Sequence, residues 1–220
     1  MKEIKLGLLG LGTVASGLVK AIQKNTDKLA QRNGFSLKVQ SVAVRDLNAK
    51  RDCVLDPSLL TDDAFSVVNN TDVDIVVELI GGIDFASKLI RTALENGKAV
   101  VTANKALLAD QGDELFALAE ANNTALFFEA SVAGGIPIVK TLRESFAGNE
   151  IKSISGIMNG TCNYILTQMQ ENGLSFDDAL QQASDLGYAE ADPSLDIDGD
   201  DTAQKICILS SLVHGSWFSP

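Results

Sequence analysis

The residues best suited to acid–base chemistry are an aspartate and a lysine, four positions apart, near the end of the sequence. Asp201 and Lys205 share one face if this stretch is helical, with the acid on the N-terminal side. Histidine occurs only once, as His214. A lysine can exchange protons if burial or a neighbouring cation lowers its pKa, so Lys205 is the better candidate for proton transfer. The plainer interpretation is a solvated salt bridge.

Further charged residues could hold a small polar molecule. Glu190 and Asp196 lie in the acidic segment 187–199 and could bind an ammonium group, although acidic loops are often simply solvated. Lys105 follows the apolar run 99–102, which is typical of a strand. Open α/β sheets bind ligands at the carboxyl ends of their strands, so Lys105 is also expected near a ligand.

A glycine-rich turn near the N-terminus predicts a dinucleotide site. The turn follows an apolar run at residues 4–9 and opens a helical pattern, the context in which Gly-x-Gly-x-x-Gly/Ala holds a pyrophosphate. The first glycine permits the tight turn, the second lets the backbone approach phosphate, and the alanine allows close helix–strand packing. An ordinary structural turn is the alternative. The predicted contacts are Gly10, Gly12, Thr13, Val14 and Ala15.

The end of the second predicted strand bears on the choice of dinucleotide. Arg45 precedes Asp46 there, about 30 residues beyond the glycines. An arginine can hold the 2′-phosphate of NADP, whereas an acid accepts hydrogen bonds from the ribose of NAD. Arg45 favours NADP, and Asp46 leaves NAD open.

Composition restricts the class of protein. The net charge of −11 argues against sequence-independent binding to nucleic acid or to an anionic membrane. No apolar run approaches the roughly 20 residues that span a bilayer. The three cysteines are widely spaced and fit a reducing cytoplasm better than a disulfide framework: Cys53, Cys162 and Cys207.

The elements that position these residues alternate between strands and helices in the first part of the chain. Such alternation predicts a Rossmann-like, doubly wound parallel sheet of the α/β class in a domain covering residues 1–132. Strands are expected at 4–9, 37–44, 74–79, 99–102 and 125–128, and helices at 13–22, 85–96 and 107–121. A second domain, 133–220, is expected to contain a short helix ending near 145, a strand at 150–158, a helix starting at Ser175 and a helix at 200–214.

Four segments together resemble the homoserine dehydrogenase family. The resemblance extends from about Ile4 to His214, and the Gly-Tyr-Ala-Glu-Ala-Asp-Pro segment with its downstream aspartate and lysine is more specific than the glycine turn. The segments are Thr102–Lys105, Phe128–Pro137, Ile157–Tyr164 and Gly187–Pro193 with Asp196, Asp201 and Lys205.

This resemblance implies an activity and its residues. The family interconverts L-aspartate 4-semialdehyde and L-homoserine with NADPH or NADH, in the biosynthesis of threonine and methionine. Lys205 is then the favoured proton donor and acceptor, with Lys105 and Asp201 as further catalytic residues. Gly160 and Lys105 would contact the cofactor. The implied substrate contacts are Glu190, Asp196, Tyr188, Thr161 and Lys105.

The family also implies partners that the residues do not reveal by themselves. A monovalent cation such as Na⁺ is expected on hard oxygen ligands, the Glu129 side chain and the backbone carbonyls of Val132, Gly134 and Ile136. The full-length form is expected to be a homodimer. Its expected location is the cytoplasm. Catalytic chains of the family continue beyond Pro220, so residues 133–220 are expected to form an incomplete α+β substrate and dimerisation domain.

Two other functions remain open at this stage. Cys162 follows a glycine turn at a helix start, where a thiolate is stabilised, so an acylating aldehyde dehydrogenase is conceivable. An inert cysteine is the simpler interpretation. The second alternative is a non-catalytic fragment that binds a dinucleotide.

Overall fold

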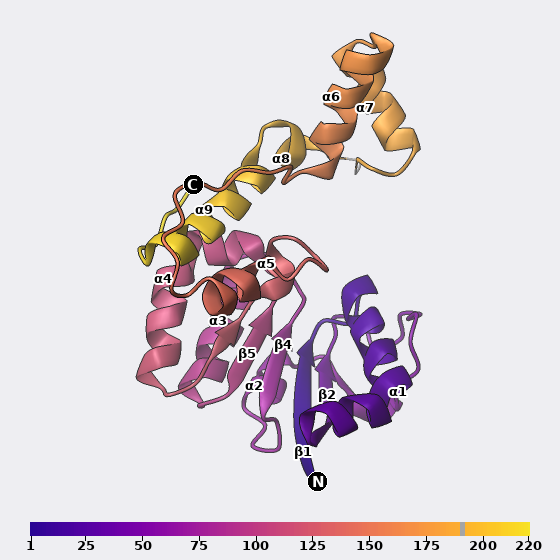
Figure 1. The fold of residues 1–220 in the computed structure, drawn as a ribbon. Helices are drawn as coiled ribbons and strands as arrows, with labels where there is room; N and C mark the ends of the chain where they lie inside the picture. Colours follow the sequence, from indigo (N-terminus) through magenta and orange to yellow (C-terminus); the bar gives the residue numbers. More distant parts are fainter. Residues whose placement is uncertain (190–191) are drawn as a thin grey trace. The chain divides into compact units, whose positions relative to one another are not determined.

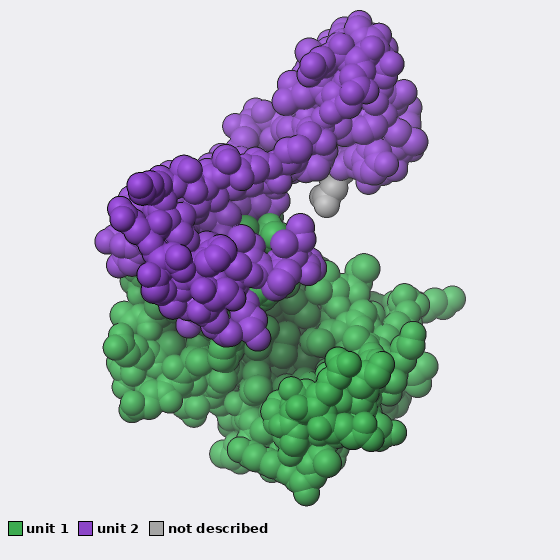
Figure 2. Space-filling view, in the orientation of Figure 1, with its two compact units in different colours: residues 1–134 green, residues 135–220 purple. Residues whose placement is uncertain are grey.

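The computed structural model describes residues 1–189 and 192–220 (Figure 1). Two compact units make up the chain, residues 1–134 and residues 135–220, which Figure 2 colours separately. Within the described residues, no helix combines the length and apolar character needed to cross a membrane.

The first unit is built on a six-stranded parallel sheet. Its strands are β1 (Lys2–Leu9), β2 (Phe35–Ala43), β3 (Leu60–Thr61), β4 (Ile75–Glu78), β5 (Ala99–Thr102) and β6 (Leu126–Phe127). Their order is β3-β2-β1-β4-β5-β6, so the chain moves outward from β1 in one direction and then in the other (Figure 1). This order confirms the doubly wound sheet expected from the sequence.

The pairing of the central strands fixes which residues meet at the carboxyl edge of the sheet. Leu9 of β1 pairs with Glu78 of β4, and Glu78 pairs with Thr102 of β5. These residues end their strands or lie at the last paired position, so the loops that follow all leave from one edge. In doubly wound sheets the crevice between the two halves of the sheet is the ligand site.

Helices connect the strands and bury the apolar side chains of the sheet. They are α1 (Thr13–Asn33), α2 (Ala64–Val68), α3 (Asp84–Glu95) and α4 (Lys105–Ala121). Two 3₁₀ turns, η1 (Pro57–Leu59) and η2 (Glu129–Ser131), complete the unit. Helix α1 runs beyond the expected end at residue 22, with non-helical angles at Asn25, and ends at Gly34 in the left-handed region. The core beneath it includes Leu8, Ala15, Val19 and Val42.

In the second unit the regular elements of the described residues are all helical. They are α5 (Ile138–Lys140), a π-helical turn η3 (Thr141–Ser145), α6 (Gly160–Asn172), α7 (Phe176–Asp185), α8 (Ser194–Ile197) and α9 (Asp200–His214). The last matches its expected bounds, because Gly199 and Gly215 adopt left-handed angles at its two ends. Ser175 caps α7 as expected, its hydroxyl oxygen accepting a hydrogen bond from the Asp178 N–H.

The strand expected at residues 150–158 is not formed. This prediction was wrong because a β-strand requires a neighbouring strand to pair its backbone groups, and every strand in the described part of the chain belongs to the first unit. The expected α+β character of the second domain is therefore absent from its described residues.

Candidate cofactor and substrate sites

Gly10 is required by the folding of the first unit itself. Its φ of +94° lies in the left-handed region, and its N–H donates to the Ala43 carbonyl oxygen at 2.9 Å. A Cβ at this position would lie 2.9 Å from the Leu79 carbonyl oxygen. Backbone therefore approaches backbone closely here, and only glycine fits without a shift.

Gly12 differs, because nothing within the chain requires a glycine there. Its φ of −82° is open to any residue, and a Cβ would have no heavy atom within 4 Å. It is the N-cap of α1 without a side-chain cap, so the first N–H groups of the helix are available to an acceptor. Thr13 and Val14 are exposed next to it, whereas Ala15 is buried against the sheet. This is the geometry of an anion site at a helix N-terminus.

The loop after β2 presents an arginine to solvent. Arg45 is exposed, and no hydrogen bond or ion pair joins it to another residue in the described part of the chain. The Asp46 carboxylate accepts the Asn48 N–H at 2.8 Å, and its carbonyl oxygen accepts a hydrogen bond from the Arg51 guanidinium. Asp46 is thus engaged within its own loop, while Arg45 is available to a ligand.

Lys105 is half-buried at the beginning of α4. The preceding residue, Asn104, caps the helix, its side-chain oxygen accepting the Leu107 N–H at 3.1 Å. The position of Lys105 is therefore set by a buried cap in the first unit.

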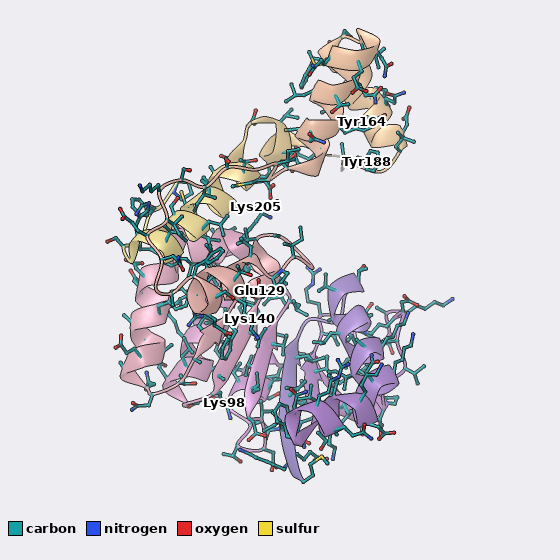
Figure 3. All side chains as sticks on the ribbon, viewed as in Figure 1. Lys98, Glu129, Lys140, Tyr164, Tyr188 and Lys205 are labelled. Atoms are coloured by element: carbon teal, nitrogen blue, oxygen red, sulfur yellow. The ribbon has the colours of Figure 1, made fainter. Side chains whose placement is uncertain are left out.

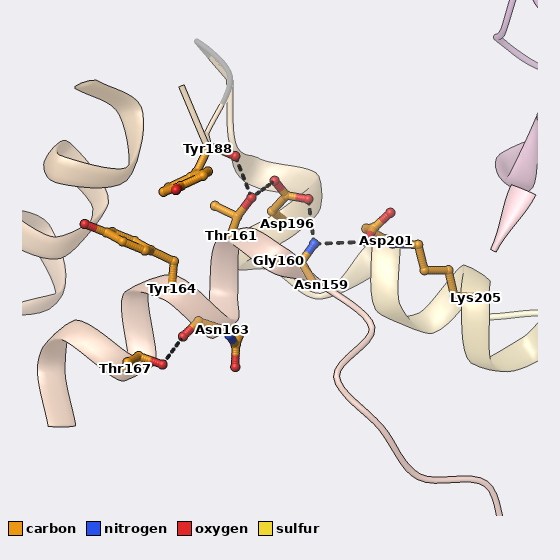
Figure 4. A pocket seen from close by; sticks show the side chains of 10 residues that line it. All are labelled: Asn159, Gly160, Thr161, Asn163, Tyr164, Thr167, Tyr188, Asp196, Asp201 and Lys205. Carbon is orange, nitrogen blue, oxygen red and sulfur yellow. Dashed lines mark hydrogen bonds and ion pairs between the residues drawn. The ribbon is translucent and has the colours of Figure 1, made fainter. Parts of the chain in front are cut away.

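In the second unit, a hydrogen-bonded chain joins the residues predicted to bind substrate and transfer protons (Figure 4). The Lys205 Nζ donates to an Asp201 carboxylate oxygen and to the Met158 carbonyl oxygen, both at 2.7 Å. The exposed fractions of the two side chains are 18% for Lys205 and 10% for Asp201, so this is not a solvated surface pair. Thr161 places its hydroxyl 2.9 Å from the Asp196 carboxylate.

Asn159 links these groups, and the sequence interpretation missed it. Its buried side-chain amide donates to Asp196 at 2.7 Å and to Asp201 at 2.9 Å. Its oxygen accepts the Cys162 N–H at 2.8 Å and so caps α6. Its role as a helix cap could be predicted from the sequence, because asparagine is a preferred N-cap residue and directly precedes the helix start at Gly160. The contacts to the acids could not, because those acids are 37 and 42 residues away in the sequence.

The pocket formed by these groups extends along α6. Its lining residues are Asn159, Gly160, Thr161, Asn163, Tyr164, Thr167, Tyr188, Asp196, Asp201 and Lys205. The Tyr164 and Tyr188 rings lie 5.0 Å apart between centroids, where α6 meets the segment after α7 (Figure 3). Gly160 is exposed at the first position of α6. Glu190, the other predicted substrate acid, lies outside the described residues.

Cys162 lacks the surroundings of a nucleophile. Its thiol donates to the Asp196 carbonyl oxygen at 3.0 Å. Burial, and then the negative charges of Asp196 and Asp201, raise the pKa of the Cys162 thiol. A thiolate is therefore disfavoured at neutral pH, and this argues against an acylating dehydrogenase.

The residues expected to hold a monovalent cation lie where the two units join in sequence. Glu129 is half-buried in η2 and Val132 is buried, whereas Gly134 and Ile136 are exposed. Nowhere in the described chain, this segment included, do three or more His, Cys, Asp or Glu side chains cluster as metal ligands.

The sheet order and the glycine turn define a Rossmann-type α/β protein. Models of known families match both parts of the chain: the homoserine dehydrogenase NAD-binding domain matches residues 10–129, and homoserine dehydrogenase matches residues 137–220. The chain belongs to the homoserine dehydrogenase family.

Individual relatives agree with this assignment. The homoserine dehydrogenases of Neisseria gonorrhoeae and Pseudomonas aeruginosa are 48% and 47% identical, each over 98% of this chain and 49% of the relative. A crystal structure of a homoserine dehydrogenase from Thiobacillus denitrificans has a TM-score of 0.90 at 47% identity, covering 98% of this chain and 50% of that one. The chain thus spans about half the length of these relatives.

A hyperthermophilic archaeal homoserine dehydrogenase in complex with NADPH is a more distant structural relative. It has a TM-score of 0.84 at 31% identity and covers 97% of this chain and 70% of that one.

Replacing Asn159 tests whether its amide holds the two carboxylates together. We expect Asn159→Ala to lower the free energy of unfolding by about 1–3 kcal/mol, because one buried carboxylate, one half-buried carboxylate and the Cys162 N–H lose their partner. Asn159→Asp should destabilise more at about pH 7 than at about pH 4. A third carboxylate beside Asp196 and Asp201 has its pKa raised, so the folded state gains protons and stability as pH falls.

Urea unfolding at both pH values measures these changes. Asn163→Ala is the matched control, since Asn163 is exposed on the same helix and its hydrogen bonds within the described chain, to Asn159 and Thr167, are made by its backbone and not by its side chain. Equal stability of the Asn159→Ala and Asn163→Ala proteins would contradict the assigned role.

Proposed function

We propose that this chain carries the cofactor site and catalytic residues of a homoserine dehydrogenase, which reversibly reduces L-aspartate 4-semialdehyde to L-homoserine with NADPH. The observation that carries the proposal is the chain of hydrogen bonds from Lys205 through the buried Asp201 and Asn159 to Asp196. A surface salt bridge would need neither burial nor the asparagine.

The reaction assigns a task to each of these groups. When bound, the nicotinamide supplies a hydride to the aldehyde carbon, which leaves a negative charge on the oxygen. Lys205 donates a proton to that oxygen and takes it back in the reverse direction. Asp201 and the Met158 carbonyl oxygen hold the Lys205 ammonium group in place. Asp196, with Glu190, binds the ammonium group of the substrate, and Tyr188 and Thr161 line the same site.

The cofactor belongs to the first unit in this proposal. The open position at Gly12 and the uncapped start of α1 fit a pyrophosphate, and Arg45 fits the 2′-phosphate of NADP. Lys105 and Gly160 complete the cofactor contacts, and Lys105 also serves substrate and catalysis. We accordingly propose residues 1–132 as the cofactor domain and 133–220 as the substrate domain.

Further parts of the proposal come from the family resemblance. They are a homodimer of the full-length form, a cytoplasmic location, and a structural Na⁺ held by Glu129 and the carbonyls of Val132, Gly134 and Ile136. Gly134 and Ile136 are exposed, and the Ile136 carbonyl oxygen already accepts the Ile138 N–H at 2.8 Å, so its second lone pair would have to serve the cation.

The cofactor site is tested by Gly12→Val. We expect NADPH affinity to fall more than tenfold, which is a loss of more than about 1.4 kcal/mol in binding free energy, because a branched side chain would occupy the space needed by the pyrophosphate. Thermal stability should be retained, since the position is open within the protein. NADPH fluorescence titration measures the affinity, with Gly17→Val as control, because Gly17 is an exposed and equally open position further along α1. Unchanged affinity in Gly12→Val would remove the dinucleotide site from this turn.

Cofactor preference is tested by Arg45→Ala. Affinity for NADPH should fall by about tenfold while affinity for NADH changes little, because only NADPH carries the 2′-phosphate. Lys50→Ala removes the same charge from an exposed position in the same loop and should affect the two cofactors alike. Equal losses for NADPH and NADH in Arg45→Ala would make Arg45 a surface residue.

The activity and the role of Lys205 are tested together by following NADPH oxidation with L-aspartate 4-semialdehyde. Lys205→Ala should lower kcat by about 10²–10⁴ and leave NADPH binding nearly unchanged. Lys205→Arg keeps the charge but stays protonated, so it should not restore the rate. A near-native kcat in Lys205→Arg would reduce Lys205 to a charge partner. NADPH binding without oxidation by the unaltered chain would instead support the non-catalytic alternative.

A further inference from the structure

Glu78 is a carboxylate buried at the centre of the first unit, where burial is costly. Its side chain is fully inaccessible, and within the described chain no lysine or arginine forms an ion pair with it. One carboxylate oxygen accepts the N–H groups of Ile80 and Gly81, at 2.9 and 3.0 Å. The other accepts the Thr102 hydroxyl at 2.6 Å. Three hydrogen bonds therefore satisfy a group that an apolar residue could replace without this desolvation cost.

On one side, Glu78 shapes the loop that borders the glycine turn. The loop continues through Gly81 and Gly82, whose φ values of +71° and +75° suit glycine alone. The Leu79 carbonyl oxygen in this loop is the atom that a Cβ on Gly10 would meet at 2.9 Å. The loop thus borders the glycine turn at Gly10.

On the other side, the same carboxylate reaches the start of α4. The Thr102 hydroxyl oxygen accepts the Asn104 N–H at 3.0 Å, and the Asn104 side-chain amide donates to the Gly82 carbonyl oxygen at 2.6 Å. Asn104 also caps the helix that begins at Lys105. These hydrogen bonds close a ring that runs from Glu78 through Thr102 and Asn104 to Gly82, in the loop after β4, which we call the glycine loop.

The ring lies at the carboxyl edge of the half of the sheet formed by β4, β5 and β6. A Cβ on Gly81 or Gly82 would have no heavy atom within 4 Å, so the loop leaves open space on its outer side. In a doubly wound fold each half of the sheet takes one mononucleotide, and the glycine turn with the loop after β2 serves the adenosine half. The ring is consequently placed to serve the nicotinamide half.

We propose that Glu78 is a positioning residue that shapes the site for the nicotinamide half of the cofactor, by fixing the glycine loop and the helix start that carries Lys105. This inference rests on the proposed dinucleotide site. It predicts an effect restricted to ligands that contain the nicotinamide half, which a general loss of stability would not produce.

The test compares NADPH with adenosine 2′,5′-bisphosphate, which contains only the adenosine half, by titration calorimetry on the whole chain. Glu78→Gln keeps the shape but turns an amide donor toward the Thr102 hydroxyl, so that hydroxyl loses its acceptor. Thr102→Val removes the hydroxyl altogether. Both variants should weaken NADPH binding by about tenfold and leave the bisphosphate within about twofold of the unaltered chain.

Two further variants sharpen the comparison. Thr102→Ser keeps the hydroxyl and should bind NADPH as the unaltered chain does. Thr92→Val removes a hydroxyl that bonds only within α3, to the Lys88 carbonyl oxygen, and should have no effect. Circular dichroism establishes folding, and Thr102→Val decides the matter if Glu78→Gln does not fold.

Unchanged NADPH affinity in a folded variant, or equal losses for both ligands, would overturn the role of Glu78. Failure of the unaltered chain to bind NADPH is a different result, since it would contradict the proposed dinucleotide site itself.

Discussion

The parallel pairing of β1 with β4 and of β4 with β5 brings Leu9, Glu78 and Thr102 into one row at the carboxyl edge of the sheet. The glycine turn after β1, the loop after β4 and the start of α4 all begin within a few residues of this row. Gly10 turns the chain toward α1, and Lys105 opens α4. The loops between strand and helix are short, so the register of the strands decides where these residues stand. A shift in that pairing would displace the glycine turn relative to Glu78 and break the buried ring of hydrogen bonds.

In the second unit the carboxylates of Asp201, which is buried, and Asp196, which is half-buried, lie close together, since both accept hydrogen bonds from one side-chain amide. Like charges of this kind repel unless donors lie between or beside them. The Asn159 amide contributes one N–H to Asp196 and the other to Asp201, and Lys205 supplies the opposite charge. Because the neutral Asn159 amide serves both carboxylates, Lys205 forms its ion pair, within the described chain, with Asp201 alone. The same carboxylates disfavour a thiolate at Cys162, so one arrangement suits a lysine acid and disables a cysteine nucleophile.

Three positions of the first unit are occupied by glycine for three different reasons. Gly10 is required by backbone packing and by its left-handed φ, and Gly81 by its φ alone. Gly12 meets neither requirement, because its angles are ordinary and the space beside it is empty. Openness alone does not identify a ligand site, since Gly17 is equally open, but at Gly12 the uncapped helix start favours the close approach of an anion. Sequence spacing alone does not separate these cases.

The sequence by itself determined the features that depend on neighbouring residues: the glycine turn, the alternation of strands and helices, the cap at Ser175 and the helix from Asp200 to His214. These follow from local backbone preferences and hydrophobic periodicity, which act over a few positions. Only the tertiary structure decided whether residues 150–158 pair as a strand, because pairing needs a partner strand that the described residues do not supply. It also decided that Asn159 meets acids 37 and 42 residues away, since hydrogen bonds between distant segments depend on how the helices pack.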